Sequence, residues 1–150
     1  MNDKDLIKHP EGGWFKEVYR SCLTVTEHSR QRCALTHIYF SLDQEDVSRF
    51  HKVTSDEIWN LYEGEGLTLY LWDEQSRTLE EKILSRAQRE YCQVVPAGLW
   101  QAAVPFGKTV LVGCSVAPGF EFSDFELIDP DSAVAGDIIA SHPRLARLIN

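Results

Sequence analysis

Short runs of β-branched and aromatic residues recur along most of this chain, and turn-forming residues separate them at close intervals. Clusters such as EGEG at residues 63–66 and PFG at residues 105–107 mark the breaks. The pattern predicts short antiparallel strands and hence an all-β sandwich or barrel. The predicted strands span residues 14–20, 35–42, 47–53, 57–63, 67–72, 78–84, 90–95, 99–104, 109–116 and 120–127.

Three other segments need a separate interpretation. Residues 2–8 form a short polar start, for which a helical turn is predicted. Residues 79–90 have the propensity of an amphipathic helix, but the surrounding meander favours a strand over their first half. Apolar residues in the tail, residues 131–150, follow a helical pattern that Pro143 interrupts, so short helices are expected to pack outside the barrel.

The length of 150 residues predicts a single domain over residues 1–150, with the barrel at about 9–128. A net charge of −8 repels nucleic acid and anionic membranes, so neither is an expected partner. No apolar run approaches the ~20 residues that span a bilayer, and the N-terminus lacks a secretory pattern. The four cysteines form no CxxC pair, which favours reduced thiols. The expected location is therefore the cytoplasm.

Candidate chemistry lies in two stretches. The first carries His51 and then Glu57, and the second runs PAGLWQ and ends at Gln101. A histidine and a carboxylate flanked by β-forming residues can ligate a metal or transfer a proton, but an isolated strand histidine is more often a hydrogen-bonded wall residue. The residues alone leave these alternatives open.

Together the two stretches resemble the motifs of the cupin superfamily, which are His-x-His followed by Glu and Gly, and Pro-x-Gly-x-x-His. His51, Glu57 and Gly64 match the first motif, and Pro96 and Gly98 match the second. The resemblance implies a double-stranded β-helix fold, which is a jelly-roll-like barrel. Short helices are expected at both ends of the chain.

Two positions depart from these motifs. The second histidine of the first motif falls on Val53, and the histidine of the second motif falls on Gln101. Because a catalytic metal normally has three protein ligands, no obligatory metal or other cofactor is expected. If a metal binds, its candidate ligands are His51, Glu57 and Gln101.

The flanking stretches make the resemblance more specific. HPEGGWF at residues 9–15, SDEIW at 55–59 and VAPGFEF at 116–122 resemble the cupin family called DUF985, or cupin type 5. Membership implies a barrel related to the dTDP-sugar epimerases of the rhamnose pathway, and assembly as a homodimer.

The related epimerases also imply roles for individual residues. By this resemblance His51 is the general base, Glu57 the carboxylate beside it, and Arg49 a phosphate contact. Glu17 corresponds to a residue that reaches the sugar nucleotide. The acid would be a tyrosine, and no local motif selects one, so Tyr39 is carried only as a substrate contact.

Two further side chains complete the expected binding site. Gln101 stands where the second motif has its histidine, and Trp59 follows Glu57 on the same strand face, where an aromatic ring can stack on a sugar. The expected function is binding of a small polar metabolite, a sugar or nucleotide sugar, with metal-independent epimerisation or isomerisation by His51. The alternatives are a non-catalytic binding module and a metal-dependent oxygenase.

Overall fold

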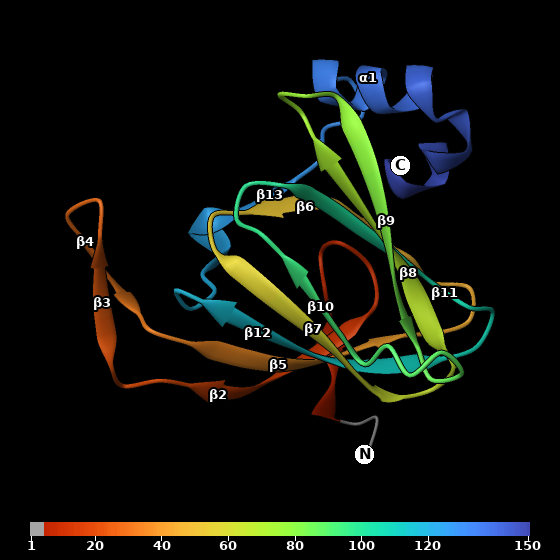
Figure 1. Cartoon of the computed structure of the whole chain (residues 1–150). Coiled ribbons are helices and arrows are strands. Elements are labelled where there is room, and N and C mark those ends of the chain that lie inside the picture. The colour runs from red at the N-terminus through yellow and green to blue at the C-terminus, as the bar shows by residue number, and fades with distance from the viewer. Residues whose placement is uncertain (1–4) are drawn as a thin grey trace.

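Two antiparallel sheets, a separate hairpin and a pair of C-terminal helices make up residues 5–150, which is the part of the chain that this computed structural model describes (Figure 1). The strands are β1 (Ile7–Lys8), β2 (Trp14–Arg20), β3 (Thr24–Glu27), β4 (Arg30–Cys33), β5 (Thr36–Leu42), β6 (Ser48–Val53), β7 (Asp56–Glu63), β8 (Gly66–Asp73), β9 (Thr78–Ser85), β10 (Cys92–Val95), β11 (Trp100–Pro105), β12 (Val110–Ala117) and β13 (Phe125–Leu127). The six-stranded sheet has the order β1-β2-β5-β12-β7-β10, and the five-stranded sheet has the order β13-β6-β11-β8-β9.

The core lies between the two sheets and follows from residue alternation. On β7 the side chain of Trp59 points inward and is 1% exposed, whereas its neighbour Ile58 points outward. Phe40 and Leu69 contribute to the same buried cluster from β5 and β8, one from each sheet. The arrangement confirms the predicted all-β, jelly-roll-like barrel.

The strands predicted between residues 14 and 116 are confirmed, with ends that shift by no more than two residues. Residues 78–85 form a strand, so the tertiary pairing of β9 with β8 outweighs the helical propensity of this segment. Within the described residues, no helix is long and apolar enough to cross a membrane.

One predicted strand was wrong, and one hairpin was missed. Residues 120–127 were predicted to form one strand, but a 3-10 turn, η2 (Phe122–Asp124), interrupts the segment and only β13 pairs in a sheet. The β3–β4 hairpin was missed because its strands are mostly exposed and lack the alternation that marks a half-buried strand. β6 and β7 follow each other in the chain but belong to different sheets.

The N-terminal prediction is only partly covered by the structure. A helical turn was expected over residues 2–8, and residues 1–4 lie outside the described part of the chain. Ile7 and Lys8 are extended, because they pair with Phe15 and Trp14 as the short strand β1.

The C-terminal tail folds as predicted. Helix α1 (Ala133–Ser141) begins after Ser132, whose hydroxyl accepts the backbone N–H of Ala135, and Pro143 opens the following 3-10 helix, η3 (Pro143–Leu148). Both elements pack on the outer side of the five-stranded sheet (Figure 1). The residues of this second cluster are Phe50, Trp72, Trp100, Ala102, Ile128, Ala135, Ile138, Leu145, Leu148 and Ile149.

Shortening Ile138 tests this docking. Ile138 is fully buried, so Ile138→Val should lower the free energy of unfolding by about 1 kcal/mol, measured by urea denaturation. Ile139 is only partly buried beside the same cluster, so Ile139→Val is the matched control with a smaller expected loss. Equal losses in the two variants would contradict the docking of α1 through its Ile138 side.

Candidate functional site

A cavity of about 380 Å³ opens between the two sheets. Its wall combines apolar rings with several ionisable groups. The aromatic residues are Phe15, Phe40, Trp59, Phe120, Phe122 and Phe125, and the ionisable residues are His9, Glu11, Glu17, Arg20, His51, Cys114, Glu57 and Glu121. The volume is at the lower end of the range for small-molecule sites, which is ~300–1,000 Å³.

A bulge in β6 fixes the orientation of His51. Gln101 of β11 lies opposite His51 and Ala103 lies opposite Ser48, so two residues of β6 face a single residue of β11. The bulge moves Arg49 out of the inward-facing series and leaves its carbonyl beside the histidine. Nδ1 of His51 bonds this carbonyl oxygen at 2.8 Å.

Glu11 meets the other ring nitrogen of His51. Its Oε2 lies 3.0 Å from Nε2 of His51, and its Oε1 accepts a hydrogen bond from the hydroxyl of Ser48 at 2.9 Å. Glu11 lies on the loop before β2, which closes against β6 because the backbone N–H of Arg49 donates to the carbonyl oxygen of Glu11. Both ring nitrogens of His51 are therefore engaged.

Burial favours the uncharged forms of His51 and Glu11, in which one proton lies between the two side chains. Burial lowers the pKa of His51 to about 4. Burial, and after it the charge of Glu57, raises the pKa of Glu11 well above its usual range. Since Nδ1 donates to the carbonyl of Arg49, a neutral His51 has its lone pair on Nε2 and accepts the proton of the Glu11 carboxyl.

His9 adds a second imidazole to this loop. Its Nδ1 accepts the backbone N–H of Glu11 at 3.3 Å, and its ring packs edge-on against Phe15 with centroids 4.8 Å apart. Burial, followed by the charge of His51, lowers the pKa of His9 to about 3. His9 is thus a neutral positioning group for the Glu11 backbone.

Glu57 is the second carboxyl of the cavity. It projects inward from β7, the strand next to β12 in the six-stranded sheet, and it is 7% exposed. Burial raises the pKa of Glu57 to about 7, and the nearby indole N–H of Trp59 opposes that rise. Among the described residues Glu57 forms no ion pair, so its carboxyl can gain or lose a proton near neutral pH.

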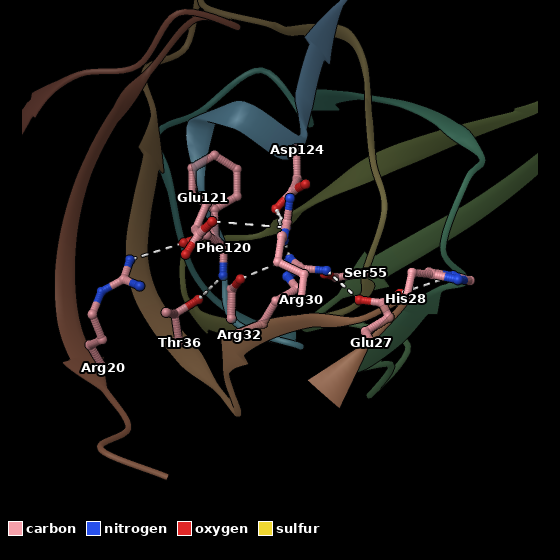
Figure 2. Close-up of polar contacts among 11 residues, drawn as sticks. Arg20, Glu27, His28, Arg30, Arg32, Thr36, Ser55, Phe120, Glu121 and Asp124 are labelled. Carbon is pink, nitrogen blue, oxygen red and sulfur yellow. Dashed lines mark hydrogen bonds and ion pairs between the residues drawn. The ribbon is translucent and has the colours of Figure 1, made fainter. Parts of the chain in front are cut away.

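Residues 119–125, called the mouth segment here, form one side of the cavity. Its backbone is held by three side chains, which Figure 2 shows. Phe120 donates its N–H to the hydroxyl of Thr36 at 2.9 Å, its carbonyl accepts from Arg20 at 2.9 Å, and the carbonyl of Gly119 accepts from Arg32 at 3.0 Å.

Arg32 links the mouth segment to the β3–β4 hairpin (Figure 2). Its side chain is 2% exposed and lies 2.7 Å from Glu27 and 3.0 Å from Asp124. Arg30, on the same strand but half exposed, also pairs with Asp124 at 2.6 Å. The hairpin that projects from the barrel therefore supplies the cations that anchor the cavity mouth.

The family model for the cupin superfamily family DUF985 matches residues 1–128. The chain belongs to this cupin family. Protein SO0799 from Shewanella oneidensis is 30% identical over 99% of this chain and 96% of its own, with a TM-score of 0.84. A hypothetical protein from Leishmania major is 29% identical over 96% of this chain and 90% of its own, with a TM-score of 0.77. The uncharacterized protein YML079W of Saccharomyces cerevisiae is 30% identical over 83% of this chain and 71% of its own.

Four of the residues expected at the site line the cavity of this cupin. They are Glu17, His51, Glu57 and Trp59. His51 and Glu57 face the same cavity although their strands belong to different sheets, because the chain crosses from one sheet to the other between β6 and β7.

The other three expected residues do not line the cavity. Gln101 is fully buried behind it, where its Oε1 accepts the indole N–H of Trp59 at 2.9 Å. Arg49 bonds the carbonyl oxygen of Pro10 at 2.6 Å. Tyr39 points to the outer side of β5, where its ring contacts Tyr62 edge-on. Each of the three is thus placed away from a ligand in the cavity.

Glu11 and His9 were not predicted to be site residues. Both fall in HPEGG at residues 9–13, part of the stretch that was used only to identify the family. Gly12 adopts a φ of 115° and lies against the backbone of Val47, so a residue with a Cβ would push this loop away from β6. The two adjacent glycines were the available signal that the loop packs tightly on a neighbouring strand.

The cupin metal does not fit this site. Val53 offers no donor atom, the Oε1 of Gln101 is already bonded to Trp59, and Nε2 of His51 is 3.0 Å from Glu11. Among residues 5–150, no three His, Cys, Asp or Glu side chains are grouped as a metal site requires. The geometry suits a shared proton better than a coordinated ion.

Proposed function

We propose that the cavity binds a small uncharged carbonyl compound of the sugar class and moves a proton at the carbon next to its carbonyl. Glu57 is the general base in this proposal, and the Glu11–His51 pair is the acid. The observation that carries it is the close contact of Glu11 with Nε2 of His51, in the same cavity as a carboxyl whose pKa is near 7. A base titrating near neutrality and a nearby acid are the two parts that epimerisation or isomerisation needs.

His51 acts through Glu11 in this proposal. Nδ1 of His51 is held by a backbone carbonyl and Nε2 by Glu11, so a ligand in the cavity meets the Glu11 carboxyl first. The alternative is His51 as the direct base, which requires the Glu11 carboxyl to leave Nε2 when substrate binds. The two versions predict different exchange rates for the Glu11→Gln variant. If the Glu11–His51 pair is the acid, the rate should fall, and if His51 is the direct base, exchange should be retained.

The charges favour a neutral sugar over a nucleotide sugar. Among the described residues, Arg20 is the one arginine that lines the cavity, and it already bonds Glu17 at 2.7 Å. Three further carboxyl groups, those of Glu11, Glu57 and Glu121, line the same space. A diphosphate would meet carboxylates without a free cation. The aromatic rings, by contrast, suit stacking on the apolar face of a sugar.

Hydrogen exchange from solvent tests the proposal. The full chain is incubated in D2O with dihydroxyacetone, hexoses and 4-keto-6-deoxyhexoses, and deuterium at the carbon next to the carbonyl is measured by mass spectrometry. Glu57→Gln should lower the exchange rate of the responsive probe at least ~100-fold, because it removes the base. Glu63→Gln, at the exposed end of the same strand, is the matched control and should keep the wild-type rate.

Three outcomes would contradict this assignment. Saturable binding of a sugar without exchange would favour the non-catalytic binding module. Full exchange in Glu11→Gln together with its loss in His51→Asn would make His51 the direct base. Stoichiometric iron, manganese or zinc in untagged protein, lost in Glu57→Gln, would favour the metal-dependent oxygenase.

A further inference from the structure

One nucleophile of the cavity has no part in the reaction proposed above. Cys114 projects inward from β12, lines the cavity and is 2% exposed. The other three cysteines do not line the cavity. Cys22 and Cys92 are exposed, and the thiol of Cys33 donates to the backbone carbonyl oxygen of Ser21. Cys114 is therefore the one thiol that a ligand in the cavity can meet.

Cys114 and Glu57 are diagonal neighbours on the inner side of the six-stranded sheet. In the pairing of β12 with β7, Cys114 lies opposite Trp59, and Val116 lies opposite Glu57. Side chains offset by one such step on the same side of a sheet have Cβ atoms ~7 Å apart, which is within reach of a long side chain. The thiol and the carboxyl can therefore both contact one small molecule that lies between them.

Glu57 independently indicates a ligand beside this thiol. Its side chain is 7% exposed, points into the same cavity and forms no ion pair among residues 5–150. A buried carboxyl without a charged partner is costly unless a ligand completes its surroundings. A nucleophile and a base that face the same space are the two parts of covalent catalysis.

The thiol of Cys114 does not ionise by itself. Burial, and after it the charges of Glu57 and Glu11, raises the pKa of Cys114 well above its usual range. A protonated thiol resists oxidation and alkylation. It can still add to an aldehyde when a base takes its proton, because the aldehyde oxygen needs that same proton. The surroundings of Cys114 therefore favour a carbonyl compound as its reaction partner.

We propose that the cavity converts 2-oxoaldehydes, uncharged dicarbonyl compounds such as methylglyoxal, into 2-hydroxy acids through a covalent bond to Cys114. The inference rests on the proposed function, since Glu57 remains the base that moves a proton next to a carbonyl. It adds a nucleophile, a narrower substrate class and a final hydrolysis.

The first steps transfer protons and need no external oxidant. Glu57 takes the thiol proton as Sγ of Cys114 bonds to the aldehyde carbon, and gives it to the aldehyde oxygen, so that a hemithioacetal forms. Glu57 then removes the hydrogen of that carbon, while the Glu11 carboxyl protonates the neighbouring ketone oxygen, which gives an enediol. Glu57 returns its proton to the former ketone carbon. The hydroxyl of the first carbon gives its proton back to Glu11, and a thioester remains.

Water completes the reaction by cleaving the thioester. The carbon–sulfur bond breaks, the thiol regains a proton from the water, and the acid leaves with a hydroxyl on its second carbon. The aldehyde carbon is thereby oxidised and the ketone carbon reduced, so one dicarbonyl and one water give one 2-hydroxy acid. The product is an anion, which the carboxylates of Glu17 and Glu121 on the cavity wall repel.

Lactate formation from methylglyoxal tests the proposal. The full chain is incubated with methylglyoxal, and both lactate enantiomers are measured by chiral chromatography against a protein-free control. Cys114→Ser should lower the rate at least ~100-fold, because it removes the nucleophile. Cys92→Ser removes an exposed thiol on β10 and is the matched control, which should form lactate at the wild-type rate.

The covalent step has a readout that a purely structural role of Cys114 would not change. After an acid quench, the peptide that contains Cys114 should gain the mass of one methylglyoxal in the wild-type chain, because acid preserves a thioester. The same peptide should stay unmodified in Glu57→Gln, where the thioester cannot form. Cys114→Ala is the second variant at this position, and both variants should keep the wild-type circular dichroism spectrum.

The outcomes separate this inference from the proposed function. Deuterium exchange into a sugar without lactate formation in the wild-type chain would overturn the inference and leave the proposed function standing. A wild-type chain that shows neither activity would overturn both. Wild-type lactate formation in folded Cys114→Ser and Cys114→Ala, or its loss in Cys92→Ser, would contradict the role of Cys114.

Discussion

At pH 8, Glu57→Gln is expected to have a free energy of unfolding about 3 kcal/mol higher than that of the wild-type chain. The pKa of Glu57 is raised by burial from 4.5 in the unfolded chain to about 7 in the fold. A group with a raised pKa stabilises the fold fully below pH 4.5 and loses that contribution as the pH rises through 7. Glutamine has nearly the same shape and does not ionise, so the variant avoids this loss.

Urea unfolding at pH 4.5, 6 and 8 measures the difference. The two proteins should be about equally stable at pH 4.5, and the gap should open between pH 4.5 and 7. The lowered pKa of His51 acts in the opposite direction, removing stability as the pH falls from 6.5 toward 4, but it does so in both proteins and largely cancels from their difference. A constant gap at all three pH values, or a less stable variant at pH 8, would show that Glu57 is not a strained carboxyl.

A higher free energy of unfolding in Glu57→Gln would indicate that Glu57 is a functional residue. Residues retained at a cost in stability are characteristic of functional sites, where an unfavourable environment sets the pKa that a reaction needs. Together with the exchange assay, the variant would show whether the residue that destabilises the fold is also the one that moves the proton.

Arg32→Met is expected to lower the free energy of unfolding by about 3–5 kcal/mol, which is typical of removing one partner of a buried ion pair. Arg32 is 3% exposed and bonds Glu27, Ser55 and the carbonyl oxygen of Gly119, and its Nη2 lies 3.0 Å from Asp124. Methionine fills a similar volume but leaves these acceptors without a donor. Urea unfolding at pH 7 measures the loss.

Arg30→Met is the matched control for this experiment. Arg30 pairs with the same Asp124 from the same strand, but it is solvent exposed, so its loss should be much smaller. Hydrogen exchange at the backbone N–H of Phe120 adds a local readout, since this N–H belongs to the mouth segment and should exchange faster in Arg32→Met. Similar losses in the two variants would mean that burial of Arg32 adds nothing to its contacts.

The barrel strands could be predicted because their pattern is local. Alternation and turn residues fix each strand from β2 to β12 wherever one side of the strand is buried. The β3–β4 hairpin lacks that alternation, and its turn places His28 and Ser29 at φ values of 48° and 64° without the Asn-Gly or Asp-Gly pair that signals such a turn. In residues 120–127, Phe120 and Phe122 line the cavity without pairing in a sheet, and only Phe125–Leu127 form a strand.

The site was harder to predict because it depends on contacts that no local pattern specifies. His51 and Glu57 were identified by the motif, yet the carboxyl bonded to His51 is that of Glu11, at a distance of 40 positions along the chain. Arg49 was expected to contact a phosphate by resemblance, but the bulge in β6 takes it out of the series of residues that point into the cavity. A bulge depends on how two strands register against each other, which the residues of one strand do not reveal.

The loop that carries Glu11 is held to the barrel by separate contacts with β6 and not by an extended strand pairing. β1 contributes only two paired residues, the carbonyl of Glu11 receives one backbone hydrogen bond from β6, and the remaining contacts are made by the side chains of Ser48, Arg49 and His51. Its local unfolding therefore requires less free energy than unfolding of the sheets. The barrel can therefore remain folded while Glu11 is displaced from His51. The fraction of molecules that can react is then set by the attachment of this loop. The melting temperature of the protein does not report that fraction.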